Sequence, residues 1–165
     1  MSTPEADEEL VRIYVHLLDR DPPSGERMWA RALGEDLYEV RNVPFEAYEL
    51  NWGDVVHAVA PSEELAPQVR SVVKRSGHLT VRLIVNDDDL SVSERETLFE
   101  RLNELEAFYE HAGGRLYCFD VEPQADYDEV RALLIAERDA GRLVFEEAWR
   151  PRPTDDAPQD LPDWL

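Results

Sequence analysis

The sequence contains one cysteine, Cys118, one lysine, Lys74, and no long apolar run. A single cysteine excludes an internal disulfide and the paired-cysteine sites that hold zinc or iron–sulfur clusters. No segment approaches the ~18 apolar residues of a membrane-spanning helix, and the acidic residues 1–10 lack the basic start of a signal peptide. Together these absences predict a protein of the reducing cytoplasm.

Motifs that mark common enzyme sites are also absent from the sequence. It has no G-x-G-x-x-G or P-loop for nucleotides, no G-x-S-x-G turn for a nucleophilic serine and no H-E-x-x-H for zinc. The acidic run 86–89 fails the calcium-loop pattern, because Val92 and Leu98 stand where a glycine and a carboxylate are needed. The four histidines, at positions 16, 57, 78 and 111, are scattered and do not have the spacing of metal ligands. We therefore expect no cofactor and no metal.

What the chain has in excess is negative charge. Thirty-seven acidic residues face seventeen basic ones, which gives a formal net charge of -20. Such a field repels phosphate backbones and anionic lipids and attracts basic surfaces. The composition therefore predicts a partner protein with a basic surface, and neither nucleic acid nor membrane. Solubility alone would account for the same charge.

The first half of the sequence has the pattern of short strands joined by tight turns. Apolar and polar residues alternate over 10–18, residues 27–33 and 37–42 flank the turn Gly34-Glu35-Asp36, and further strands are expected over 55–60 and 68–74. Residues 19–26 and 61–67 read as loops. This pattern predicts a small barrel-like β unit of the SH3-like kind over residues 10–75.

The second half predicts helices between strands. A strand over 79–85 precedes a helix with Ser93 and Glu96 as its capping box, and Asp126 is the expected N-cap of a second helix that Gly141 stops. Between them a hairpin is expected, although the first helix could instead run on to His111. The resulting order βαββαβ is that of a ferredoxin-like unit over residues 76–150, with its last strand over 142–149.

The two ends of the chain read as flexible segments. Residues 1–9 form an acidic lead, and residues 151–165 combine prolines with aspartates in a composition typical of disorder. The joint near residues 74–78 is too short for a free linker, so the two units are expected to pack together.

Several segments resemble the bacterial family catalogued as domain of unknown function 4265. The resemblance rests on Trp29-Ala30, the strand at Tyr38, Asn42-Val43-Pro44-Phe45, Gly53-Asp54-Val55-Val56 and Ser76-Gly77-His78. It covers roughly residues 10–149. The resemblance implies a bacterial origin and a single module, and it implies no activity.

Ser76-Gly77-His78 is the first candidate site. A hydroxyl, backbone N–H groups beside a glycine and an imidazole that titrates near neutral pH could act together on a ligand. The same residues could equally form a tight turn in which His78 bonds the backbone.

Asn42, Trp52 and Asp54 are the second candidate, because aromatic and polar groups together suit a pocket for a ligand or peptide. The alternative is that these are turn and core residues, with Asp54 accepting hydrogen bonds from backbone N–H groups.

These observations lead to a hypothesis of a non-enzymatic protein-interaction module, immunity- or antitoxin-like toward a basic partner. The alternatives are a small-molecule-binding regulatory domain and an enzyme with a site near Ser76 and His78.

Overall fold

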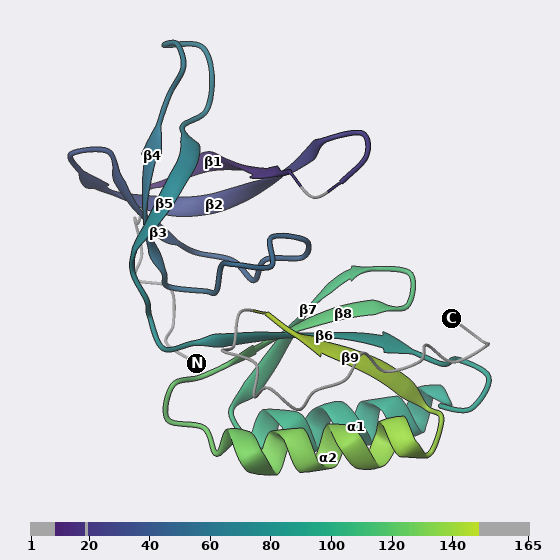
Figure 1. Ribbon diagram of the computed structural model, residues 1–165. Helices are drawn as coiled ribbons and strands as arrows, with labels where there is room; N and C mark the ends of the chain where they lie inside the picture. The colour runs from purple at the N-terminus through teal and green to yellow at the C-terminus, as the bar shows by residue number, and fades with distance from the viewer. Residues whose placement is uncertain (1–8, 19, 149–165) are drawn as a thin grey trace, which may run out of the picture. The chain divides into compact units, whose positions relative to one another are not determined.

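The computed structural model describes residues 9–18 and 20–148, and the chain divides into two compact units between His78 and Leu79 (Figure 1). The sequence places that division three residues earlier, between Arg75 and Ser76. No helix in the described ranges is both long and apolar enough to cross a membrane. The expected acidic tail lies outside the described residues, as do Trp149 and nearly all of the expected lead.

The first unit is a closed five-stranded barrel, which confirms the small barrel expected from the sequence. Neighbouring strands are antiparallel, except that β1 and β5 meet in parallel to close the barrel. The strands are β1 (Leu10–Leu17), β2 (Ser24–Gly34), β3 (Leu37–Val40), β4 (Val55–Val59) and β5 (Gln68–Lys74).

Strand β1 shows how the sequence pattern produces this barrel. Ile13 and Leu17 are buried, whereas Arg12 and His16 on the opposite face are exposed, as the alternation predicts. The buried members form a barrel core with residues of the other strands and of the loop after β3: Met28, Ala30, Val40, Ala47, Leu50 and Val56.

Strand β2 begins at Ser24. The expected loop over residues 19–26 is therefore wrong for its last three residues, which belong to the strand. Register pairs continue to Leu17 and Ser24, and Pro22-Pro23 therefore interrupt only the turn. Gly25 is needed in this pairing because a Cβ atom there would lie 2.0 Å from the ring of Tyr14.

The second unit is a four-stranded sheet with two helices on one face (Figure 1). The order of the strands in the sheet is β7-β8-β6-β9, with antiparallel neighbours throughout. Each helix therefore joins two strands that have a third strand between them. The elements, in the expected order βαββαβ, are β6 (Leu79–Val85), α1 (Val92–Glu104), β7 (Ala107–Gly113), β8 (Leu116–Val121), α2 (Tyr127–Asp139) and β9 (Leu143–Glu147).

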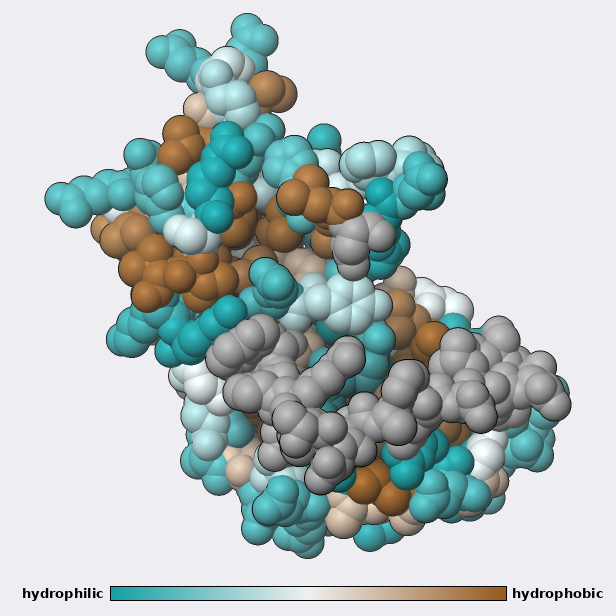
Figure 2. Space-filling view, in the orientation of Figure 1, coloured by the Kyte–Doolittle hydropathy of each residue, from teal (hydrophilic) through white to brown (hydrophobic). Residues whose placement is uncertain are grey.

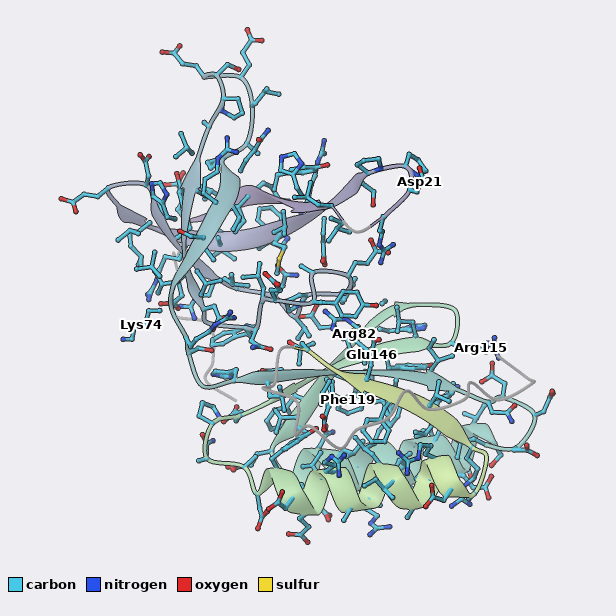
Figure 3. The ribbon with its side chains drawn as sticks, viewed as in Figure 1. Asp21, Lys74, Arg82, Arg115, Phe119 and Glu146 are labelled. Atoms are coloured by element: carbon cyan, nitrogen blue, oxygen red, sulfur yellow. The ribbon has the colours of Figure 1, made fainter. Side chains whose placement is uncertain are left out.

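An aromatic core lies between this sheet and its helices. Phe119 is 2% exposed, and its ring centroid lies 5.1 Å from that of Phe99. Figure 3 shows Phe119 on the helix side of the sheet, and Arg82 and Glu146 on the other side. Arg82 and Glu146 are register partners, which explains why they share a face.

The start of α1 differs from the expected one. Ser91, not Ser93, is the N-cap: its side chain accepts a hydrogen bond from the Glu94 N–H, and the Glu94 carboxylate accepts one from the Ser91 N–H. Both serines fit S-x-x-E, but Leu90 is buried in the core directly before Ser91, which places the start of the helix there.

The ends of the helices follow the remaining predictions with one exception. Helix α1 ends at Glu104, so its extension to His111 is wrong, and Glu106 turns the chain into β7 with a φ of 60°. Asp126 is the N-cap of α2, and Gly141, with a φ of 76°, follows its last turn, as expected.

Candidate functional site

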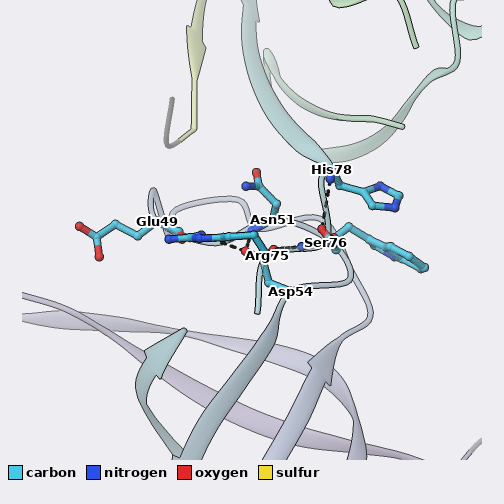
Figure 4. A network of polar contacts seen from close by, with 7 residues as sticks. Glu49, Asn51, Asp54, Arg75, Ser76 and His78 are labelled. Carbon is cyan, nitrogen blue, oxygen red and sulfur yellow. Dashed lines mark hydrogen bonds and ion pairs between the residues drawn. The ribbon is translucent and has the colours of Figure 1, made fainter. Parts of the chain in front are cut away.

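Asp54 is the centre of a polar network in the barrel unit (Figure 4). Its side chain is 1% exposed, and its carboxylate accepts hydrogen bonds from the N–H groups of Asn51, at 3.0 Å, and Ser76, at 2.8 Å. The Arg75 guanidinium, 3.0 Å away, supplies the compensating charge and also donates to the Glu49 carbonyl. A buried carboxylate needs such partners, and the network ties the end of the barrel unit to the turn before β4.

Ser76 and His78 lie against that turn. The Ser76 hydroxyl donates to the Trp52 carbonyl at 2.6 Å and accepts from the His78 backbone N–H at 3.1 Å. The ring centroids of Trp52 and His78 are 4.8 Å apart. Gly53 permits this approach, because its φ is 77° and an added Cβ would lie 3.1 Å from the Ser76 Cβ.

Five of the six candidate residues are therefore brought together, and Asn42 has a different role. Its side-chain oxygen accepts a hydrogen bond from the Trp29 N–H at 2.7 Å, and its amide donates to the Val43 carbonyl. Asn42 thus fixes the chain where it leaves β3.

The chemistry of this network is that of a structural joint. A nucleophilic serine gives its proton to a base, whereas the Ser76 proton goes to a backbone carbonyl. The recorded bond between Ser76 and His78 comes from the His78 backbone and not from its ring. The arrangement holds the segment at Ser76 against the turn at Trp52.

A groove opens elsewhere on the barrel unit, with a volume of about 770 Å³. It lies between the end of β1, residues 47–50 and β5. Most of its lining is apolar, and the polar or charged side chains are those of His16, Glu49, Arg70 and Ser71. The other lining residues are Val15, Leu17, Leu18, Ala47, Tyr48, Leu50, Val69 and Val72.

Incomplete strand pairing accounts for this groove. In the register, β1 meets β5 only at Tyr14 and Gln68, where the Tyr14 N–H donates to the Pro67 carbonyl at 2.8 Å. The side chains of His16 and Gln68 meet at the closed end, 3.0 Å apart. Beyond this point no register pair joins the facing edges of the two strands in the described chain, and an edge without a partner strand offers backbone groups for pairing.

The floor and rim of the groove differ in burial. Leu50 is 3% exposed and belongs to the barrel core, whereas Leu18 on the rim is 81% exposed and Tyr48 is 41% exposed. Figure 2 shows apolar side chains at the surface of the barrel unit over β3 and β5.

The loop that forms one wall of the groove is held by Glu26 on β2. Its carboxylate accepts hydrogen bonds from the N–H groups of Phe45, Glu46 and Ala47, at 2.7, 2.9 and 2.8 Å. Because three backbone donors converge on one carboxylate, the fold itself fixes the conformation of this wall.

Sequence reasoning missed the groove. The apolar residues Leu17-Leu18 at the end of the first strand were the available signal, but the loss of pairing between β1 and β5 depends on strands far apart in the chain. Among the described residues there is no group of three or more metal-ligating side chains. Cys118 is buried.

The chain resembles other proteins in sequence and in fold. The model of the family described as "Domain of unknown function (DUF4265)" matches residues 26–145. A crystal structure of a hypothetical protein from Neisseria gonorrhoeae has a TM-score of 0.72 and 16% identity, and the match covers 86% of this chain and 96% of that one. At this identity the likeness shows the fold alone. No curated protein matches the chain.

Proposed function

We propose that this chain, which belongs to the DUF4265 family, is a protein-interaction module that binds an extended segment of a partner in the groove between β1 and β5. The observation that carries the proposal is the pair of strand edges that diverge beyond Tyr14 and Gln68. An extended segment would pair with such an edge and place alternate side chains on the apolar floor.

The groove supplies both parts of this mode of recognition. Unpaired backbone groups give hydrogen bonds that do not depend on sequence, and Leu50, Val69 and Val72 give a surface that favours apolar side chains. Leu18 and Tyr48 stand exposed on the rim, where a bound segment would remove them from water.

The net charge of -20 favours a basic partner. Long-range attraction between opposite charges raises association rates and disfavours acidic competitors. A protein that covers a basic partner in this way would act as an immunity- or antitoxin-like protein does. The cytoplasm of a bacterium is the proposed setting.

We also propose a fold type for each of the two units. The closed five-stranded barrel supports an SH3-like first unit. The strand order β7-β8-β6-β9, with each helix joining strands that are not neighbours, supports a ferredoxin-like second unit.

A small-molecule-binding regulatory domain is the second candidate. The groove volume of about 770 Å³ lies within the range of ligand pockets, roughly 300–1,000 Å³. A thermal-shift screen of metabolites tests it, because a ligand at about 100 times its dissociation constant adds roughly 2.7 kcal/mol of stability. An enzyme near Ser76 and His78 has weaker support, since their recorded contacts are those of a joint.

Peptide selection on the full-length chain tests the leading proposal. We expect a displayed library of random peptides to yield basic sequences with alternating apolar residues, whose binding weakens as salt is raised. Leu18→Ser and Tyr48→Ser should each weaken the selected peptides by about tenfold. The matched controls Leu33→Ser and Leu65→Ser remove exposed apolar side chains elsewhere on the unit. Equal losses in all four variants would contradict the proposal, as would selected peptides without basic residues.

A further inference from the structure

The outer face of the β1–β2 hairpin is cationic and aromatic, although the chain as a whole is strongly acidic. In the register, Arg12 faces Trp29 and Tyr14 faces Arg27. Because alternate residues of a strand share one face, these four side chains lie on the outside of the barrel, opposite to the buried residues of the two strands. We call the surface formed by Arg12, Tyr14, Arg27 and Trp29 the arginine face.

Trp29 holds the side chain of Arg12 in place on this face. The Arg12 guanidinium lies 3.7 Å from the centroid of the Trp29 ring, which is a close cation–π contact, and Trp29 is 40% exposed. Stacking occupies the flat side of a guanidinium and leaves the N–H donors at its edge for a planar acceptor such as a carboxylate. Arg12 is therefore positioned without its donors being used.

The two arginines have no counter-charge in the described part of the chain. Arg12 and Arg27 are exposed, and no ion pair or hydrogen bond of either side chain is recorded among the described residues. The neighbouring carboxylates have other partners. Glu39 of β3 is paired with Arg31 at 2.9 Å, and Glu26 accepts hydrogen bonds from the loop after β3. Two guanidinium groups are thus open to an external anion.

The spacing of the two arginines matches that of an extended acidic segment. Arg27 stands two residues before Trp29, the direct partner of Arg12, so the two arginines are diagonal neighbours. The Cα atoms of diagonal neighbours are about 7–8 Å apart. In an extended segment, residues with one residue between them point to the same side and are about 6.5–7 Å apart. Two carboxylates at that spacing can each meet one guanidinium.

We propose that the arginine face binds an extended segment of a partner protein that carries two acidic residues separated by one residue. This inference concerns a different surface from the groove and goes beyond the proposed function. Each carboxylate accepts hydrogen bonds from the edge of one guanidinium, which is a charge-assisted contact with a preferred geometry.

The distribution of charge along the chain is compatible with an acidic ligand on this face. Residues 10–78 contain eleven acidic and eight basic side chains, whereas residues 79–148 contain eighteen and seven. At physiological ionic strength, exposed charges more than about 8 Å apart are largely screened. The local arginines therefore dominate at contact distance. A nucleic acid adds a negative charge with every nucleotide, so the net charge of -20 opposes it more than a segment with two carboxylates.

Two labelled peptides of identical composition test the spacing on the full-length chain. Both have blocked ends and are built of threonine and valine with two glutamates. In one the glutamates are separated by one residue, and in the other they are adjacent and so point to opposite sides when extended. By fluorescence anisotropy at physiological ionic strength, we expect the spaced peptide to bind about fivefold tighter, the effect of one exposed ion pair. Its addition should also shift the NMR signal of the Trp29 indole N–H.

A matched pair of double variants tests the location. Arg12→Gln combined with Arg27→Gln should weaken binding of the spaced peptide by more than about tenfold, because both ion pairs are lost. Lys74→Gln combined with Arg101→Gln is the control, since it removes the same charge at exposed positions that do not belong to the face. We expect the control to bind the spaced peptide as the unaltered chain does.

Three results would overturn the proposal. The first is equal affinity for the spaced and the adjacent peptide. The second is an equal loss of affinity in the two double variants, which would mean that total charge rather than the arginine face governs binding. The third is a fluorescent oligothymidylate that binds through Arg12 and Arg27 more tightly than the spaced peptide at the same ionic strength, which would assign the face to nucleic acid.

Discussion

The two units of this chain use their apolar residues differently. In the second unit, two helices cover one face of the sheet, and Phe99, Tyr117 and Phe119 meet in a continuous core. In the barrel, Ile13 and Met28 are fully buried while Leu18 and Tyr48 remain exposed beside a groove. Where helices cover a sheet, its apolar face is buried in folding. Where β1 and β5 are not paired, apolar side chains stay exposed beside a groove.

The largest effect that this comparison predicts is in the aromatic core. Phe119→Ala should lower the free energy of unfolding by about 3–5 kcal/mol, because it leaves a cavity among packed rings. Urea denaturation followed by fluorescence measures the loss. Tyr109→Ala is the control: Tyr109 contacts the same rings but is 43% exposed, so its loss should be smaller. Equal losses would mean that the core is no more tightly packed than its edge.

The next effect distinguishes a joint from a reactive site in the barrel. Asp54→Asn should cost about 1–3 kcal/mol, because the Arg75 guanidinium and the backbone N–H groups of Asn51 and Ser76 lose a charged acceptor. Asp36→Asn, at an exposed turn position with a φ of 59°, should change stability by less than about 0.5 kcal/mol. If Asp54→Asn lowered the free energy of unfolding no more than the control does, Asp54 would not be a structural residue.

The sequence predicted local features of the fold correctly, but it did not predict features that depend on the pairing of strands far apart in the chain. Alternation over residues 10–18 and the turn at Gly34 predicted β1 and the β2–β3 hairpin, because strand and turn signals are local. The sequence did not predict that Ser76 would lie beside Trp52 and Asp54. The hydrogen bonds that join them link a side chain to a backbone group of a segment more than twenty residues away. The groove was missed for the same reason.

The helix start shows a limit of another kind. Ser91 and Ser93 each head an S-x-x-E motif, and only the burial of Leu90 selects the first. Ser91→Ala should therefore cost about 1 kcal/mol, as loss of an N-cap does. Ser93→Ala should stay within about 0.5 kcal/mol of the unaltered chain. Thermal and urea unfolding of the two variants measure this difference, and a larger loss for Ser93→Ala would return the N-cap to the position expected from the sequence.

The smallest effect depends on pH and comes from the same cap. The hydrogen bond from the Ser91 side chain, followed by that from its backbone N–H, lowers the pKa of Glu94 from its ordinary value of 4.5. A carboxyl group whose folded-state pKa is depressed contributes stability above its unfolded-state pKa, and that contribution is lost as the pH falls through the folded-state value. The stability difference between the unaltered chain and Glu94→Gln should thus be constant near neutral pH and shrink below about pH 4.5.

Urea titrations of both proteins across that range measure the Glu94 effect, and Glu96→Gln provides the matched control, because Glu96 holds the equivalent place in the unused motif. A Glu94→Gln difference that grew as the pH fell would have the wrong sign for a carboxylate that accepts the cap hydrogen bonds. It would mean that the protonated form of Glu94 is the one that stabilises α1. The start of α1 would then depend on Ser91 as the N-cap and on a neutral Glu94, and the comparison of the Ser91 and Ser93 variants would still test the first of these.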